Sequence, residues 1–116
     1  MRFMHSDLTH QALLDILENA TLAQSFVGDM NLSDFAADRR TFYATVRCLE
    51  IISEASRHLD EGLLARHPEL PWRAIRSSGN VYRHNYDNVA EAFVLRTVRD
   101  SLPPLLAVVR HELDGA

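Results

Sequence analysis

The sequence predicts a single all-α domain over residues 1–116, a bundle of four main helices with short extra helical turns. Apolar residues recur at helical spacing through long segments, and no segment alternates between apolar and polar residues as a half-buried strand would. The four Gly and four Pro fall in a few places between these segments. With 116 residues, 47% of them hydrophobic, the chain is long enough to bury one core.

The first predicted helix runs from Ser6 to about Val27. Ser6 is a suitable N-cap, and Asp7 is favourable in the first turn because the helix dipole is positive there. Gly28 and the polar residues that follow it end the helix. The apolar residues keep one helical face: Leu13, Ile16, Leu17, Ala20, Ala23 and Val27.

A second, longer helix is predicted to start near Ser33 or Asp38 and to run to about Leu59. Its apolar residues cover two adjoining faces, so the helix needs neighbours on two sides. One neighbour can come from the bundle and the other from a second subunit, which predicts a homodimer. Only one sector of this helix is polar, made of Tyr43, Arg47, Glu50, Glu54 and Arg57.

The second half of the chain begins with short elements. Residues Asp60 to His67 predict one or two helical turns, and Pro71 predicts the start of another. A helix is expected over about Asn80 to Asp87. The last helix is expected over about Asn88 to Leu113, kinked at Pro103–Pro104 because proline lacks the backbone donor.

Composition limits the classes of function. No apolar run is long enough to cross a bilayer or to serve as a signal peptide, and the single cysteine predicts no internal disulfide. We therefore expect a cytoplasmic protein without a membrane partner. The net charge of −4 gives no overall attraction to nucleic acid, so RNA binding would need a local patch. All 12 basic residues are arginine, whose planar fork suits phosphate.

The candidate chemistry lies between Arg73 and Asp87. On one continuous helix, five polar side chains would share an arc of about 100°. If the helix restarts at Ser78, the first of the five leaves this arc. The five are Arg76, Asn80, Arg83, His84 and Asp87.

An arginine beside a histidine is the pair that metal-free RNA cleavage needs. A neutral histidine can accept the 2′-hydroxyl proton, and an arginine can stabilise charge that develops on the phosphate. Such a helix face is also common as a plain solvated surface. The sequence shows no tight metal-ligand spacing and no glycine-rich phosphate loop, so we expect neither a metal nor a cofactor.

Several short motifs occur in a defined order along the chain: Ile51-Ile-Ser-Glu-Ala-Ser56, His67-Pro68, Pro71-Trp72, His84-x-Tyr86 and Leu102-Pro103. From about Leu8 to Val109 the chain resembles the HepT-like family of the HEPN superfamily. This resemblance implies a helical ribonuclease toxin that acts as a homodimer. It also implies a partner, a minimal nucleotidyltransferase that acts as the antitoxin.

The family motif is an arginine, four to six residues, a histidine, one residue and a tyrosine. Position by position, the resemblance places His84 as the base and Tyr86 as the tyrosine that receives AMP from the antitoxin. Gly79 stands where the motif arginine usually falls. Arg83 is our first choice for the phosphate clamp and Arg76 the second.

Three supporting residues accompany this prediction. Asn80 and Asp87 share the polar arc, and Glu54 matches the glutamate of the family stretch, where it either orients the site or faces water. Because Gly79 replaces the motif arginine, a non-catalytic HEPN module that binds nucleotide, RNA or the nucleotidyltransferase remains the alternative.

Overall fold

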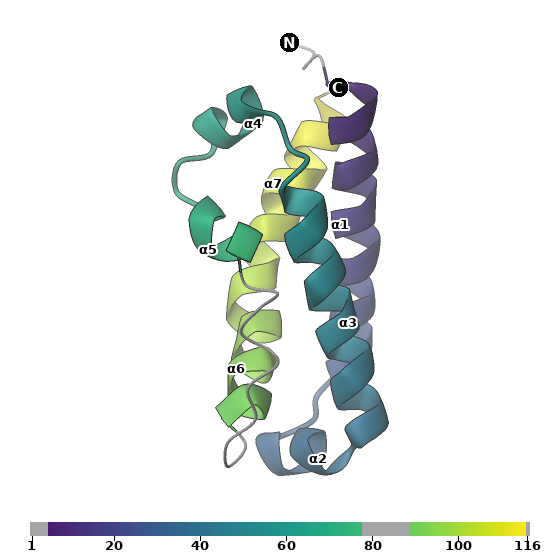
Figure 1. Cartoon of the computed structure of the whole chain (residues 1–116). Helices are drawn as coiled ribbons and strands as arrows, with labels where there is room; N and C mark the ends of the chain where they lie inside the picture. Colours follow the sequence, from purple (N-terminus) through teal and green to yellow (C-terminus); the bar gives the residue numbers. More distant parts are fainter. Residues whose placement is uncertain (1–4, 78–88, 116) are drawn as a thin grey trace.

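A computed structural model describes residues 5–77 and 89–115, and the described residues contain helices but no strand. In chain order the helices are α1 Asp7–Val27, α2 Leu32–Ala37, α3 Arg39–Ser56, α4 Glu61–Arg66, α5 Trp72–Ser77, α6 Val89–Arg96, the π-helical turn η2 Thr97–Ser101 and α7 Leu102–Asp114. Long helices pack side by side along the bundle, α2 and α4 sit toward its two ends, and α5 lies beside the bundle between them (Figure 1). This arrangement confirms the predicted all-α bundle.

The first helix has the ends that its sequence predicts. The Ser6 hydroxyl accepts a hydrogen bond from the backbone N–H of Thr9 at 3.1 Å, which caps α1. Gly28 follows the helix with a φ of +50°, a conformation that glycine adopts without strain. The face predicted to be apolar is buried in the core at Leu13, Ile16, Ala20, Ala23 and Val27.

Of the two predicted starts of the second helix, Asp38 is the start of α3, and the residues around Ser33 form the separate helix α2. Asn31 caps α2, and Asp38 ends α2 and caps α3 by accepting a hydrogen bond from the Thr41 N–H at 3.0 Å. The helix stops at Ser56, three residues before the predicted Leu59, and a turn follows. Two side-chain caps in the sequence, rather than one, account for the division.

The two apolar faces of α3 are covered within one chain. Helix α3 packs against α1 along much of its length and also contacts α2, α5 and α6. The polar sector faces away from the core, with Tyr43, Arg47, Glu54 and Arg57 exposed and Glu50 half-buried. The apolar faces of α3 are therefore covered by helices of the same chain. They do not by themselves indicate a second subunit.

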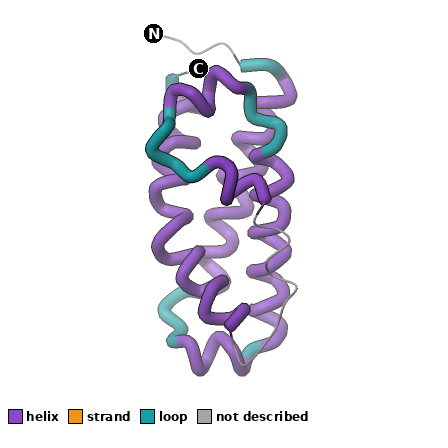
Figure 2. Tube along the Cα trace, turned by 60° about the vertical axis from the view of Figure 1, so that its left-hand side comes forward, coloured by secondary structure: helices purple, strands orange, loops and turns teal. Residues whose placement is uncertain are grey.

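A change of helix type accommodates the two prolines of the predicted last helix. Helix α6 passes into the π-helical turn η2, in which the Leu102 N–H bonds to the Thr97 carbonyl five residues back. Pro103 and Pro104 then fall in the first turn of α7, where a missing N–H costs little. Figure 2 shows that the connecting loops lie toward the two ends of the bundle.

One buried carboxylate joins three parts of the chain at the end that holds α4. The side chain of Glu112 in α7 has 0% of its surface exposed. Arg66 donates to both of its oxygens, from Nη2 to Oε1 at 2.6 Å and from Nε to Oε2 at 3.1 Å. The Nε2 atoms of His67 and His5 lie 2.6 Å and 2.9 Å from Oε2 and Oε1.

These contacts set the ionisation of Glu112. Burial alone would raise the pKa of this carboxyl, because a low-dielectric interior disfavours the charged form. The hydrogen bonds from Arg66, His5 and His67 outweigh burial and lower the pKa to about 2. The carboxylate is therefore charged at neutral pH and holds His5, α4 and α7 together.

This pKa predicts an acid-sensitive stability. The folded-state pKa lies below the ordinary value of 4.5, so the stabilisation is present above that value and is lost as the pH falls toward about 2. The loss should reach about 3 kcal/mol of unfolding free energy, from about 1.4 kcal/mol per pKa unit. Urea denaturation from pH 7 to pH 2.5 would measure it.

The Glu112→Gln variant isolates this contribution, because it removes the carboxylate and leaves the neighbouring side chains in place. It should be less stable than the wild type at pH 7, and the difference should shrink as the pH falls. The exposed Glu61, mutated to Gln, is the matched control and should keep the wild-type profile. Parallel profiles for wild type and Glu112→Gln would contradict this assignment.

Candidate functional site

The structure describes two of the predicted site residues, Arg76 and Glu54. The others lie in the segment 78–88, outside the described residues, and their arrangement stays a prediction: Asn80, Arg83, His84, Tyr86 and Asp87. The described elements on either side of this segment nevertheless show where it leaves the bundle and where it returns.

Helix α5 leads into the segment. The indole Nε1 of Trp72 donates to the His67 carbonyl at 2.8 Å, which fixes the first turn of α5 beside the Glu112 cluster. The helix includes Arg76, which is half-buried, and continues to Ser77. Arg57, just after α3, donates from Nη1 to the Arg76 carbonyl at 2.8 Å. The end of α5 is thus tied to the end of α3.

Helix α6 receives the chain after the segment. Glu91 in its first turn has 1% of its surface exposed, and its Oε2 accepts a hydrogen bond from Arg39 Nη1 at 2.8 Å. That guanidinium also donates to the Ala36 carbonyl and lies 4.6 Å from the centroid of the Phe42 ring. The hydrogen bond to Glu91, together with one to Tyr43, raises the pKa of Arg39.

Among the described residues, the Glu91 carboxylate has a partner for only one of its oxygens. Its Oε1 is buried and has no hydrogen-bond partner among the described residues. An unpaired buried oxygen is costly, so the ion pair with Arg39 is the interaction that compensates for the burial of this group. The start of α6 is therefore tied to the start of α3.

The two arginines that hold the ends of the segment, Arg39 and Arg57, lie on the same face of α3. Arg39 and Arg57 are 18 residues apart in the sequence, which is five helical turns, or about 27 Å along the axis. Both described ends of the segment that carries His84 are consequently held against one helix. Sequence reasoning placed Arg57 in the polar sector but missed its partner, and it missed the Arg39–Glu91 pair entirely.

Glu54 lies in the polar sector of α3, one turn before Arg57, and is exposed. This position is compatible with either role that the sequence left open, since an exposed carboxylate can face water or approach a neighbouring arginine. Glu54 lies at the same end of α3 as Arg57, which donates the hydrogen bond to the Arg76 carbonyl.

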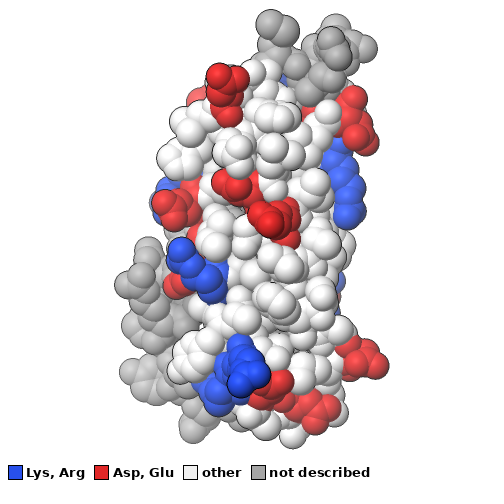
Figure 3. All heavy atoms as spheres, turned by 90° about the vertical axis from the view of Figure 1, so that its right-hand side faces the viewer, with Lys and Arg blue, Asp and Glu red and all other residues white. Residues whose placement is uncertain are grey.

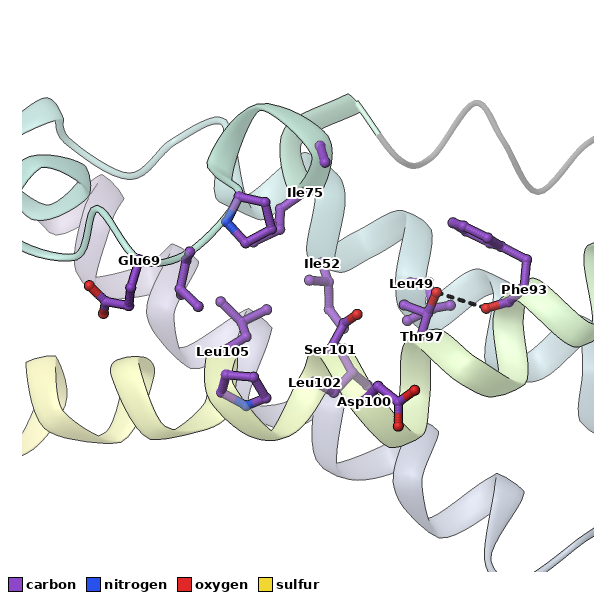
Figure 4. A pocket seen from close by; sticks show the side chains of 14 residues that line it. Leu49, Ile52, Glu69, Ile75, Phe93, Thr97, Asp100, Ser101, Leu102 and Leu105 are labelled. Carbon is purple, nitrogen blue, oxygen red and sulfur yellow. Dashed lines mark hydrogen bonds between the residues drawn. The ribbon is translucent and has the colours of Figure 1, made fainter.

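A groove of about 360 Å³ lies between α3, α5 and the turn from η2 into α7. Ile75 approaches it from α5, and Phe93 and Thr97 stand at the end nearest the start of α6 (Figure 4). Its described lining includes two carboxylates, Glu69 and Asp100, and no basic side chain. Most of the lining is apolar and includes Leu49, Ile52, Ile75, Phe93, Leu102 and Leu105.

Two further observations concern the described residues. They hold no group of three His, Cys, Asp or Glu side chains that could bind a metal ion. None of their helices combines the length and the apolar character that a membrane span requires.

Comparison with known proteins gives consistent matches. Residues 16–112 match the model of the family described as Ribonuclease HepT-like. The chain is 33% identical over 105 residues to "Probable ribonuclease HepT" of Thermococcus cleftensis, covering 90% of this chain and 92% of that protein. It is 30% identical over 93 residues to "Putative RNase MJ1380" of Methanocaldococcus jannaschii, covering 80% and 85%. No solved structure matches.

Proposed function

This chain belongs to the HepT-like ribonuclease family, and from that premise we propose that it is the ribonuclease toxin of a toxin–antitoxin pair. The observation that carries the proposal is the family match over residues 16–112, which includes the segment with His84 and Tyr86. The RNA and the antitoxin would both be met in the cytoplasm, which we propose as the location.

The proposed reaction needs no metal. His84 accepts the proton of a ribose 2′-hydroxyl, and the 2′-oxygen attacks the adjacent phosphorus. The bond to the 5′-oxygen of the next nucleotide breaks, that oxygen takes up a proton, and a 2′,3′-cyclic phosphate remains. An arginine stabilises the charge on the phosphate oxygens during this step.

The choice of arginine rests on the helix that carries His84. Arg83 is adjacent to the histidine in sequence, so it reaches the same region whether or not the helix breaks before it. Arg76 is still within α5, and its backbone carbonyl is held by Arg57. We therefore keep Arg83 as the first choice and Arg76 as the second.

A second candidate function follows from Gly79, which stands in the usual place of the motif arginine. Without that charge, the same fold would serve as a non-catalytic HEPN module that binds nucleotide, RNA or a nucleotidyltransferase. Loss of a transition-state charge partner affects cleavage more than binding, so the two functions separate experimentally.

We also propose that the protein acts as a homodimer with the reaction at a cleft between two copies. The support is the apolar groove beside α5, where Ala74 and Pro104 are exposed and Ile75 and Phe93 half-buried. Apolar surface of this kind is stabilised when a second chain covers it. An interface there would include α3 or the last helix and would lie beside both ends of the segment 78–88.

Light scattering should give the mass of a dimer at micromolar concentration. Ala74→Glu adds a charge to a groove that already holds Glu69 and Asp100, so it should shift the protein toward monomer. Ser33→Glu, exposed in α2, should leave the dimer intact. A wild-type monomer at this concentration would remove the proposal.

Modification tests the antitoxin. Incubation with the cognate nucleotidyltransferase and ATP should add the mass of one or more AMP groups, measured by mass spectrometry. Tyr86→Phe should abolish the addition because the acceptor oxygen is gone, and Tyr82→Phe should not. Equal labelling of both variants would show that the acceptor is misassigned.

Cleavage tests the catalytic residues. His84→Ala should slow RNA cleavage by about 10²-fold or more, the usual contribution of a general base, and Arg83→Ala by about 10²-fold. Denaturing gels would measure the rate, and a chelator should not change it. Arg73→Ala, an exposed arginine of α5, is the control and should cleave normally. Full activity in both the His84 and the Arg83 variant would contradict a nuclease site on this segment and favour the non-catalytic binding module.

A further inference from the structure

A strip of basic and aromatic side chains runs along the outer face of α3. Arg40, Tyr43 and Arg47 are exposed and belong to neighbouring turns of one helix face, with both arginines about 40° to 60° from Tyr43 on the same side. In Figure 3, blue side chains lie toward the lower left of the face with red side chains beside them, at the end where Figure 1 places the beginning of α3. We call Arg40, Tyr43 and Arg47 the α3 strip.

Tyr43 is the centre of the strip. Its surface is 64% exposed, although it is a large aromatic residue. Its ring is nevertheless held, since the Phe42 ring packs edge-on at 5.5 Å and the Arg39 guanidinium lies 5.3 Å from the ring centroid. Glu91 in turn holds Arg39. A single exposed aromatic side chain is common on protein surfaces. An exposed aromatic ring that is fixed in position and lies between two arginines, however, offers a flat surface on which a base can stack.

Arg40 and Arg47 flank this platform. They lie seven residues apart, about 10 Å along the helix axis, with Tyr43 between them. Arg40 makes no ion pair among the described residues. Hydrogen bonds from Thr41 lower the pKa of Asp38, and the nearby charge of Arg40 lowers it further. Arg47 is 3.6 Å from Glu50, a distance and exposure at which an ion pair is weak.

Charge separates this surface from the groove. The described groove lining holds two carboxylates and no basic residue, so it repels a polyanion. The strip presents two guanidiniums and an aromatic ring, the combination that binds single-stranded nucleic acid without base specificity. The net charge of −4 makes such a local patch necessary for any RNA to bind.

We propose that Arg40, Tyr43 and Arg47 form a binding surface for single-stranded RNA, in which the arginines bind phosphates and Tyr43 stacks on a base. The proposal deepens the ribonuclease function and rests on it for the identity of the ligand. The strip lies beside the tie between Arg39 and Glu91, where the segment that carries His84 rejoins the bundle. RNA held on α3 is therefore held at one end of that segment.

Binding can be measured without cleavage. A short fluorescein-labelled 2′-O-methyl oligoribonucleotide lacks the 2′-hydroxyl that the reaction needs, so fluorescence anisotropy with the full chain reports affinity alone. Tyr43→Ala should weaken binding about tenfold, the effect of losing one stacked base. Tyr43→Phe keeps the ring and should bind like the wild type.

The arginines have a different signature. Arg40→Ala and Arg47→Ala should each weaken binding and reduce the slope of log K against log salt by about 0.7, as expected for one lost phosphate contact with a single strand. Tyr43→Ala should leave this slope unchanged. Arg110→Ala, an exposed arginine of α7, is the matched control and should change neither affinity nor slope.

The outcomes separate this proposal from the ribonuclease function. Wild-type affinity in all three alanine variants would overturn the RNA surface, even if His84 proves catalytic. Normal RNA affinity with lost modification by the nucleotidyltransferase would show that the strip binds the protein partner instead and would also overturn it. Selective loss of RNA affinity would support the strip even if the chain cleaves no RNA.

Discussion

The buried carboxylate of Glu112 organises one end of the bundle, because a charge removed from water must be matched by nearby donors. Arg66, His67 and His5 are drawn to it from far apart in the sequence. The His67 backbone then receives the Trp72 indole, which sets the start of α5. A contact made for stability thus determines where the chain enters the segment that carries His84.

At the other end, a second buried carboxylate has the same effect. Glu91 binds Arg39, so the start of α6 and the start of α3 cannot move apart without exposing or stranding a charge. Together with the hydrogen bond from Arg57 to the Arg76 carbonyl, this pair makes α3 the common support of both ends of the segment. Helix α3, which packs against α1 along much of its length, thus also supports the candidate site.

The sequence predicts local features well and distant pairs poorly. Periodicity and the Ser6 cap predict α1, because they depend on residues within one or two turns. The sequence names Asp38 as one of two possible helix starts, which α3 confirms, but it misses the separate short helix α2 before that residue. Glu112 and Glu91 are missed for another reason. A glutamate among apolar positions of a helix has no visible partner when that partner lies 46 or 52 residues away. The roles of His84 and Tyr86 come from a family resemblance, and they remain predictions.

Helix α3 also separates the two proposed contacts in space. Leu49 and Ile52, which line the groove, lie about 120° to 180° around the helix from Tyr43. A second copy seated on the groove would leave the outer face of α3 open, and RNA on that face would not cover the groove. The charges agree with this division, since the two carboxylates in the apolar groove would repel a polyanion and the arginines of α3 would attract it. The two proposals are therefore compatible in a protein with a net charge of −4, because the proposed RNA surface and the proposed dimer surface lie on different faces of α3.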